Sequence, residues 1–193
     1  MSATILTGAT LHRSANRARS APPCASGGID RKNRQMPEDA GNRGLFFDLA
    51  GTLVKMDDTR QLPLGPDGKI VVELMPGVAE KLHPIRDHLF FVITNQAGIA
   101  RGRLSLEQVE AAIAELDRQL GDILTGWQIC PHDDGDRCEC RKPKGAMLTE
   151  LGATYGVDMA GSTMIGDQEV DAAAARAAGV GHFIWAHDFF GWK

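Results

Sequence analysis

From residue 44 onward, short apolar runs alternate with segments whose apolar residues recur every three or four positions. The apolar runs predict strands at 44–48, 89–94, 126–130, 162–165 and 182–185. The amphipathic segments predict helices at about 76–86, 105–120, 144–155 and 168–178. This alternation is typical of βα units, so we expect an α/β fold with a Rossmann-like parallel sheet and helices on both faces.

Helix-end signals support these boundaries. Ser105 and Gln108 have the spacing of a capping box, and Gly121 is placed to end the same helix. Pro76 is expected in the first turn of its helix, because a proline lacks the N–H that would be unbonded there. Residues 55–75 predict a loop or small flap, so we expect a minimal cap or none.

The first 43 residues differ from the rest because they have no periodic apolar pattern. We expect 1–43 to be a disordered extension and 44–193 to be the folded domain. The alternatives are translated sequence upstream of a start at Met36, or an organellar transit peptide, since Arg13, Arg17 and Arg19 precede the first acid. Cys24 lies in this extension and receives no role.

Polar side chains follow three of the predicted strands at the point where each strand ends. They are Asp48, Thr94 and Asp167. Ligands of open α/β sheets bind outside the carboxyl ends of the strands, so these side chains are expected to share one site.

The residue types at this site favour phosphoryl transfer. Asp48 suits a nucleophile that forms an aspartyl-phosphate. Carboxylates also provide the oxygen ligands that Mg²⁺ prefers, and Asp171 lies one helical turn beyond Asp167. The groups expected to hold the phosphoryl oxygens are Thr94, Asn95, Arg141 and Lys142.

Three of the four cysteines gather near a histidine. The predicted Zn²⁺ ligands are Cys130, His132, Cys138 and Cys140. A Cys₃His set fills all four tetrahedral positions and is typical of a structural zinc site rather than a disulfide framework. Such a site favours a reducing compartment, and Arg141 and Lys142 follow the last ligand directly.

Composition limits the partners. The net charge is −4 over 193 residues, which gives no reason to expect nucleic acid. No apolar run approaches the roughly 20 residues of a membrane-spanning helix. We therefore expect a cytoplasmic protein, monomeric or a small homo-oligomer, whose partner is a small phosphorylated metabolite rather than nucleic acid or membrane.

These motifs resemble the haloacid dehalogenase (HAD) superfamily of phosphohydrolases. The residues that carry the resemblance are Asp48-Leu49-Ala50-Gly51-Thr52, Thr94-Asn95-Gln96, Arg141-Lys142-Pro143 and Gly166-Asp167. The run 94–102 and the cysteine cluster are similar to the branch that holds D-glycero-D-manno-heptose 1,7-bisphosphate phosphatase and histidinol-phosphate phosphatase. The resemblance implies a Mg²⁺-dependent hydrolase with catalytic Asp48, Thr94 and Lys142, and Mg²⁺ held by Asp48, the Ala50 carbonyl, Asp167 and Asp171.

One position departs from the family. Its phosphatases carry a second Asp two residues after the nucleophile, which protonates the leaving group, whereas this chain has Ala50. A positioned acid or base contributes about 10²–10⁴-fold. Three interpretations follow: a phosphatase of reduced or specialised activity, a phosphate-binding protein with little turnover, or an engineered Asp→Ala variant. Asp57 and Asp58 are nearby in sequence and are candidates to replace the missing acid.

Overall fold

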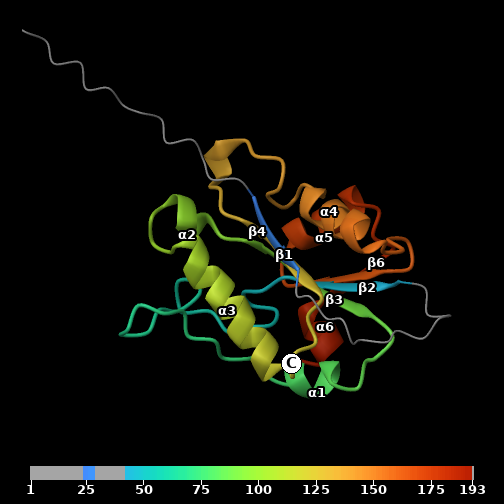
Figure 1. Ribbon diagram of the computed structural model, residues 1–193, viewed down its shortest axis with the longest axis horizontal. Coiled ribbons are helices and arrows are strands. Elements are labelled where there is room, and N and C mark those ends of the chain that lie inside the picture. Colours follow the sequence, from blue (N-terminus) through green and yellow to red (C-terminus); the bar gives the residue numbers. More distant parts are fainter. Residues whose placement is uncertain (1–23, 29–41, 193) are drawn as a thin grey trace, which may run out of the picture.

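The computed structural model describes residues 24–28 and 42–192. Their centre is a six-stranded sheet in the order β1-β4-β3-β2-β5-β6 (Figure 1). The strands are β1 (Ala25–Gly28), β2 (Gly44–Phe47), β3 (Leu89–Asn95), β4 (Gly126–Cys130), β5 (Thr163–Gly166) and β6 (His182–Trp185). All neighbouring pairs are parallel except β1 and β4, which are antiparallel. The predicted strands are therefore confirmed, with one antiparallel strand added.

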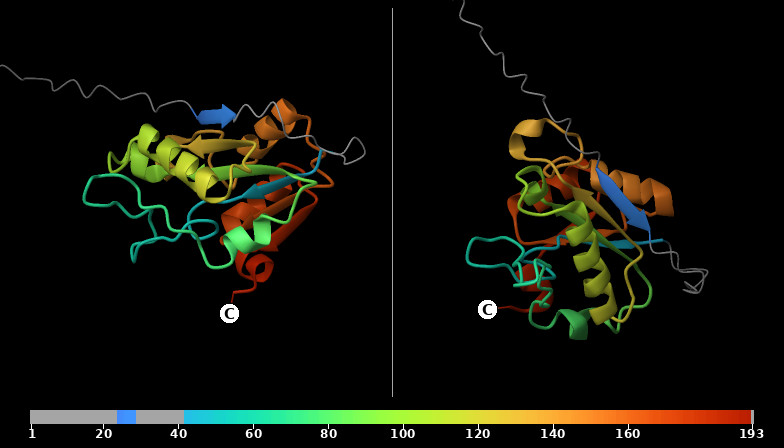
Figure 2. Two further views of the ribbon diagram at one scale, coloured as in Figure 1. Left: turned by 60° about the horizontal axis from the view of Figure 1, so that its bottom comes forward. Right: turned by 60° about the vertical axis from the view of Figure 1, so that its left-hand side comes forward.

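Helices cover both faces of this sheet (Figures 1 and 2). They are α1 (Val78–Leu82), α2 (Ala97–Ala100), α3 (Leu106–Gln119), α4 (Ala146–Tyr155), α5 (Glu169–Ala177) and α6 (Ala186–Phe190). Consecutive side chains of a strand point to opposite faces. In β2, Leu45 and Phe47 pack in one core with α1 and α3, while Phe46 packs in a second core with α4 and α5. Two apolar cores thus hold the sheet between two helical layers.

Strand β1 corrects the expectation for the N-terminal extension. Residues Ala25–Gly28 form an edge strand, with Ala25 paired to Ile129. The strand depends on small residues, because a Cβ on Gly27 would lie 2.3 Å from the ring of Trp127. A run of Ala, Ser and Gly has no alternating apolar pattern, so the sequence did not predict it. Residues 1–23 and 29–41 of the extension lie outside the described part of the chain.

The helix-end predictions were confirmed at one helix and wrong at another. Ser105 caps α3, with its hydroxyl accepting from the Gln108 N–H and the Gln108 side chain accepting from the Ser105 N–H. Helix α1 begins at Val78 instead of including Pro76. Gly77 precedes α1 at a positive φ of 76°, a conformation that glycine adopts readily and that turns the chain before the helix starts.

The segment between β2 and α1 holds isolated bridges such as Leu64↔Ile70 and, among its described residues, no helix or regular strand. This agrees with a minimal cap. The C-terminal aromatic residues fold back onto the domain, as Phe189, Phe190 and Trp192 pack against the larger core. None of the helices within residues 24–28 and 42–192 has the length and apolar character needed to cross a bilayer.

Candidate active site

The carboxyl ends of β2, β3 and β5 form the floor of the site. Strand β2 lies between β3 and β5, with Phe47 paired to Val92 and to Ile165. The next residue of the central strand, Asp48, donates its backbone N–H to the Ile165 carbonyl at 3.0 Å. Because all three strands are parallel, the polar residues at their ends meet at one edge, as the sequence predicted.

A buried lysine lies between two carboxylates at this edge. Lys142 Nζ is 2.5 Å from Asp48 Oδ1 and 2.7 Å from Asp171 Oδ1, and it also donates to the Ile93 carbonyl at 3.2 Å. Lys142 is only 4% exposed, Asp48 5% and Asp171 1%. Such a group is stable only when its charges are paired, because water is excluded from it.

Burial and charge pairing shift the pKa values of these groups in opposite directions. Burial raises the pKa of Asp48 to about 7, against the lowering effect of Lys142. Burial alone would lower the pKa of Lys142, but Asp48 and Asp171 raise it above its usual value. Burial and the neighbouring Asp171 raise the pKa of Asp167, whereas Arg60 opposes them. Asp48 and Asp167 therefore resist ionisation until more positive charge is present.

The three carboxylates fit a divalent cation. Oxygens of Asp48, Asp167 and Asp171 lie within 4.8 Å of one another. Asp167 Oδ1 is buried and has no hydrogen-bond partner. An orphaned buried carboxylate oxygen beside two other acids is explained by a bound ion, and all-oxygen ligands suit Mg²⁺. The donor set thus fits the metal that the sequence predicted.

The second strand end positions the lysine. The Asn95 side chain donates to the Lys142 carbonyl and accepts from the Lys142 N–H, both at 3.0 Å. Asn95 therefore fixes the segment that carries Lys142, a role that the sequence did not indicate. Thr94 lies beside it and its hydroxyl accepts from Gln96 Nε2 at 2.9 Å.

A cavity of about 450 Å³ opens over these groups. Its walls include Asp48, Ala50, Thr94, Asn95, Arg141, Lys142 and Asp171. Asp167 lines an adjoining hollow that shares Met56 and Arg60 with the cavity. The structure thus gathers the predicted phosphate-handling residues, and adds Arg60, Arg101 and Arg103, for which the motifs gave no role.

Ala50, at the position where the resemblance leads one to expect an acid, lines this cavity. Neither Asp57 nor Asp58 does. Asp57 Oδ1 instead accepts from the Thr59 N–H, the Thr59 hydroxyl and the Gln61 N–H. Asp57 lines the adjoining hollow with Asp167, so the alternative that it replaces the missing Asp stays a prediction.

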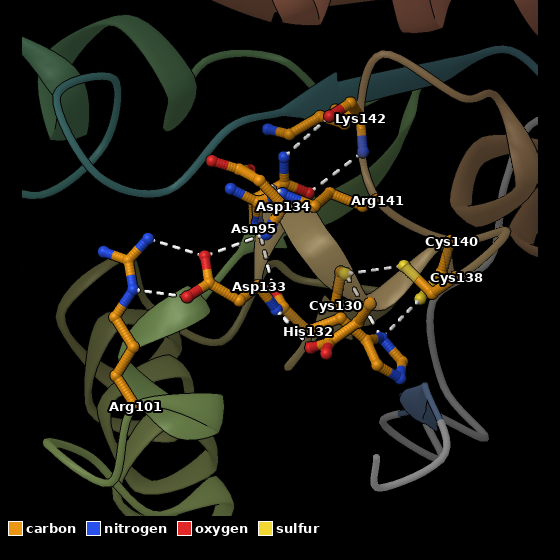
Figure 3. Close-up of polar contacts among 11 residues, drawn as sticks. Asn95, Arg101, Cys130, His132, Asp133, Asp134, Cys138, Cys140, Arg141 and Lys142 are labelled. Carbon is orange, nitrogen blue, oxygen red and sulfur yellow. Dashed lines mark hydrogen bonds and ion pairs between the residues drawn. The ribbon is translucent and has the colours of Figure 1, made fainter.

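The predicted zinc ligands also come together (Figure 3). Donor atoms of Cys130, His132, Cys138 and Cys140 lie within 4.8 Å of one another. His132 Nδ1 is 3.5 Å from Cys130 Sγ and 3.4 Å from Cys140 Sγ, and the Cys130 and Cys138 sulfurs are 3.7 Å apart. Tetrahedral zinc with its usual Zn–S and Zn–N bonds has edges of about 3.5–3.8 Å. The donor set and its spacing fit Zn²⁺.

One cysteine of this cluster corrects the sequence analysis. Cys140 forms a disulfide with Cys24, whereas Cys130 and Cys138 are free thiols. The sequence analysis gave Cys24 no role, but Cys24 precedes β1, and pairing of β1 with β4 brings it to the cluster. The sequence separation of 116 residues hid this contact. A Cys140 sulfur held in a disulfide is not a thiolate ligand, so zinc at all four positions requires the reduced form.

Two arginines connect the loop that holds the cysteine cluster (residues 130–140) to the cavity (Figure 3). Arg141 donates to Asp134 at 2.7 Å and to the His132 carbonyl at 3.2 Å. Arg101 binds both carboxylate oxygens of Asp133, at 2.7 and 2.6 Å. These contacts connect the cysteine cluster to the wall of the cavity.

Comparison with known proteins places this architecture among HAD-like hydrolases. A family model described as HAD-hydrolase-like matches residues 139–185. The crystal structure of D,D-heptose 1,7-bisphosphate phosphatase from B. bronchiseptica, complexed with magnesium and phosphate, superposes with a TM-score of 0.63 at 28% identity, covering 72% of this chain and 78% of that one. A HAD-like structure from Mesorhizobium loti has a TM-score of 0.67 at 24% identity, covers 82% of this chain and 77% of that one, and shows the fold alone.

Curated relatives define the family more closely. The D-glycero-beta-D-manno-heptose-1,7-bisphosphate 7-phosphatase of Haemophilus ducreyi is 35% identical over 159 residues, which cover 72% of this chain and 80% of that protein. The Pseudomonas aeruginosa protein of the same name is 45% identical over 89 residues, 45% of this chain and 50% of that protein. The chain thus spans half the length of one relative and four fifths of the other. It belongs to the D-glycero-beta-D-manno-heptose-1,7-bisphosphate 7-phosphatase family of HAD-like hydrolases.

Proposed function

We propose that this chain is a Mg²⁺-dependent phosphohydrolase that acts on a small phosphorylated metabolite through an aspartyl-phosphate on Asp48. The observation that carries the proposal is the buried arrangement of Asp48, Lys142 and Asp171, with Asp167 beside it. Family membership supports the reaction class. The names of the relatives support a sugar bisphosphate as substrate over histidinol phosphate, which the resemblance also allows.

Asp48 would attack phosphorus with its carboxylate. Lys142 favours the ionised carboxylate against the effect of burial, and it would also neutralise charge on the phosphoryl oxygens. Thr94 and Arg141 would donate to the same oxygens. Asn95, predicted to bind phosphate directly, is better suited to hold the Lys142 backbone in place.

The carboxylates of Asp48, Asp167 and Asp171, with the backbone carbonyl of Ala50, would hold Mg²⁺. The ion would supply the positive charge that lets two anions approach each other. Burial and neighbouring acids hold the pKa values of Asp48 and Asp167 above their usual range. This supports a site built around a cation.

Ala50 limits what the site can do next. It has no proton for the leaving oxygen and no base for the water that cleaves the aspartyl-phosphate. Hydrolysis of an alkyl phosphate should therefore be slower by about 10²–10⁴-fold than with a positioned acid. The same observation favours the second candidate function, a phosphate-binding protein with little turnover, whether Ala50 is native or engineered.

The test is phosphate release from a sugar bisphosphate, histidinol phosphate and acetyl phosphate, each with Mg²⁺. Acetyl phosphate should react fastest, because its leaving group needs no proton. Chelation of Mg²⁺ and Asp48→Asn should each remove the activity. Asp48→Asn protein that hydrolyses these esters as fast as the unaltered chain would refute the proposal.

A further inference from the structure

More cationic side chains line the cavity than one phosphoryl group requires for charge neutralisation. Within the described residues they are Arg60, Arg101, Arg103, Arg141 and Lys142. Carboxylates of the site or of the loop that holds the cysteine cluster pair with four of them: Lys142 with Asp48 and Asp171, Arg101 with Asp133, Arg141 with Asp134, and Arg60 with Asp167. Within the described residues, Arg103 remains.

Arg103 is poorly satisfied. A terminal nitrogen of its guanidinium donates to the Leu62 carbonyl at 3.2 Å, and its Nε is buried without a hydrogen-bond partner. Buried donors in native proteins are nearly always bonded, so an unbonded guanidinium nitrogen on a cavity wall points to a bound acceptor. The guanidinium fork is suited to two oxygens of one phosphate.

Arg60 approaches the same cavity from the 55–75 loop. Its backbone has a positive φ of 59°, and it ends a tight turn in which Asp57 accepts three hydrogen bonds. The Leu62 carbonyl that binds Arg103 lies two residues further on in this loop. The arginine from the loop and the arginine after α2 are thus connected through one short segment. The partner of Arg60 is Asp167, at 3.2 Å.

We propose that Arg60 and Arg103 form a second anion subsite, which binds the non-reacting phosphate of a substrate with two phosphate groups. The inference rests on the proposed function, in which the reacting phosphate lies at Asp48 and Lys142. It assigns substrate selection to two residues outside the motifs. A monophosphate would occupy the Asp48 end of the cavity and leave both guanidinium groups unused.

The experiment is calorimetric titration with fructose 1,6-bisphosphate and, separately, fructose 6-phosphate, in the presence of Mg²⁺. The unaltered chain should bind the bisphosphate at least about tenfold more tightly, the order of one charge-assisted hydrogen bond. Arg103→Gln should remove most of that preference and leave the affinity for the monophosphate unchanged, and Arg60→Gln should also lower the affinity for the bisphosphate. Arg118→Gln is the matched control, since Arg118 is exposed and paired with Glu115 on α3.

The outcomes separate the two proposals. Equal binding of both esters, or a preference that survives Arg103→Gln and Arg60→Gln, overturns the subsite and leaves the proposed function standing. If neither ester binds the unaltered chain, the proposed function fails and the subsite fails with it.

A second inference comes from the cysteine cluster. The four donors fit tetrahedral zinc, yet Cys140 is bonded to Cys24. One sulfur cannot serve both purposes, because zinc binds the thiolate. We infer that the cluster exchanges between a reduced, zinc-binding form and an oxidised form in which Cys24 and Cys140 form a disulfide.

The exchange needs an oxidant, for which a peroxide is sufficient. The Cys24 thiol and the Cys140 thiolate lose two electrons, and Cys24 loses its proton, as the sulfur–sulfur bond forms. The peroxide takes up both electrons, that proton and one from solvent, and leaves as two water molecules. The Zn²⁺ ion departs without a change of oxidation state. Arg141 and Lys142 follow Cys140 directly, so loss of the metal would reach the phosphate site.

The test is the zinc content of the protein, with peptide mapping of its disulfides. Reduced protein loaded with zinc should hold one equivalent, and mild peroxide should release it as the Cys24–Cys140 disulfide appears. Cys24→Ser keeps all four ligands and should retain zinc under the same treatment. Equal zinc loss from Cys24→Ser, or no disulfide between Cys24 and Cys140 in the oxidised protein, would overturn the inference.

Discussion

At the scale of single residues, the site depends on one buried cation among three acids. Asp48, Asp167 and Thr94 could be predicted, because each directly follows an apolar run that ends at the same edge of the sheet. The contact between Lys142 and Asp171 could not be predicted from the sequence, since it depends on how α5 packs beside the segment that precedes α4. The use of the Asn95 amide on the Lys142 backbone was hidden for the same reason.

Replacing the central lysine should therefore destabilise the fold. Lys142→Met leaves Asp48 and Asp171 buried without their shared cation, and loss of one partner from a buried pair costs about 3–5 kcal/mol. Urea unfolding of the metal-free protein measures this cost. Lys144→Met is the control, because Lys144 pairs with Glu139 at the surface. Equal unfolding midpoints for both variants would show that Lys142 does not balance the acids.

At the scale of elements, length and periodicity decided what the sequence could predict. Helix α3 has 14 residues, an apolar stripe and a capping box, and its limits were predicted closely. Helices α2 and α6 have four and five residues, too few to repeat a period. Strand β1 has no apolar alternation at all and is held by its backbone pairing with β4.

Strand β1 gives a prediction of its own. Gly27→Val would place a side chain against the Trp127 ring, because a Cβ at position 27 would lie only 2.3 Å from a ring carbon. Strand β1 should therefore detach from β4. Cys24 should then lose its contact with Cys140, and the yield of their disulfide under mild oxidation should fall. Ser26→Val is the control, because Ser26 is exposed on the same strand. An unchanged disulfide yield in Gly27→Val would mean that β1 does not position Cys24.

At the scale of the whole molecule, two apolar cores and a parallel sheet bring distant segments to one edge. The fold class followed from the alternation of strands and helices, but the strand order did not, because it depends on contacts between segments far apart in sequence. The cavity and its arginines are also products of this packing. Family membership then connects the arrangement to phosphate ester chemistry.

The rate of phosphate release by Ala50→Asp, compared with the unaltered chain, tests this account most directly. A sugar bisphosphate with saturating Mg²⁺ is the substrate. The new carboxyl group would face the cavity and supply the missing acid, so the rate should rise by about 10²–10⁴-fold. Acetyl phosphate, which needs no proton on its leaving group, should gain much less in the first step. An unaltered chain that already matches Ala50→Asp on the bisphosphate would contradict the account.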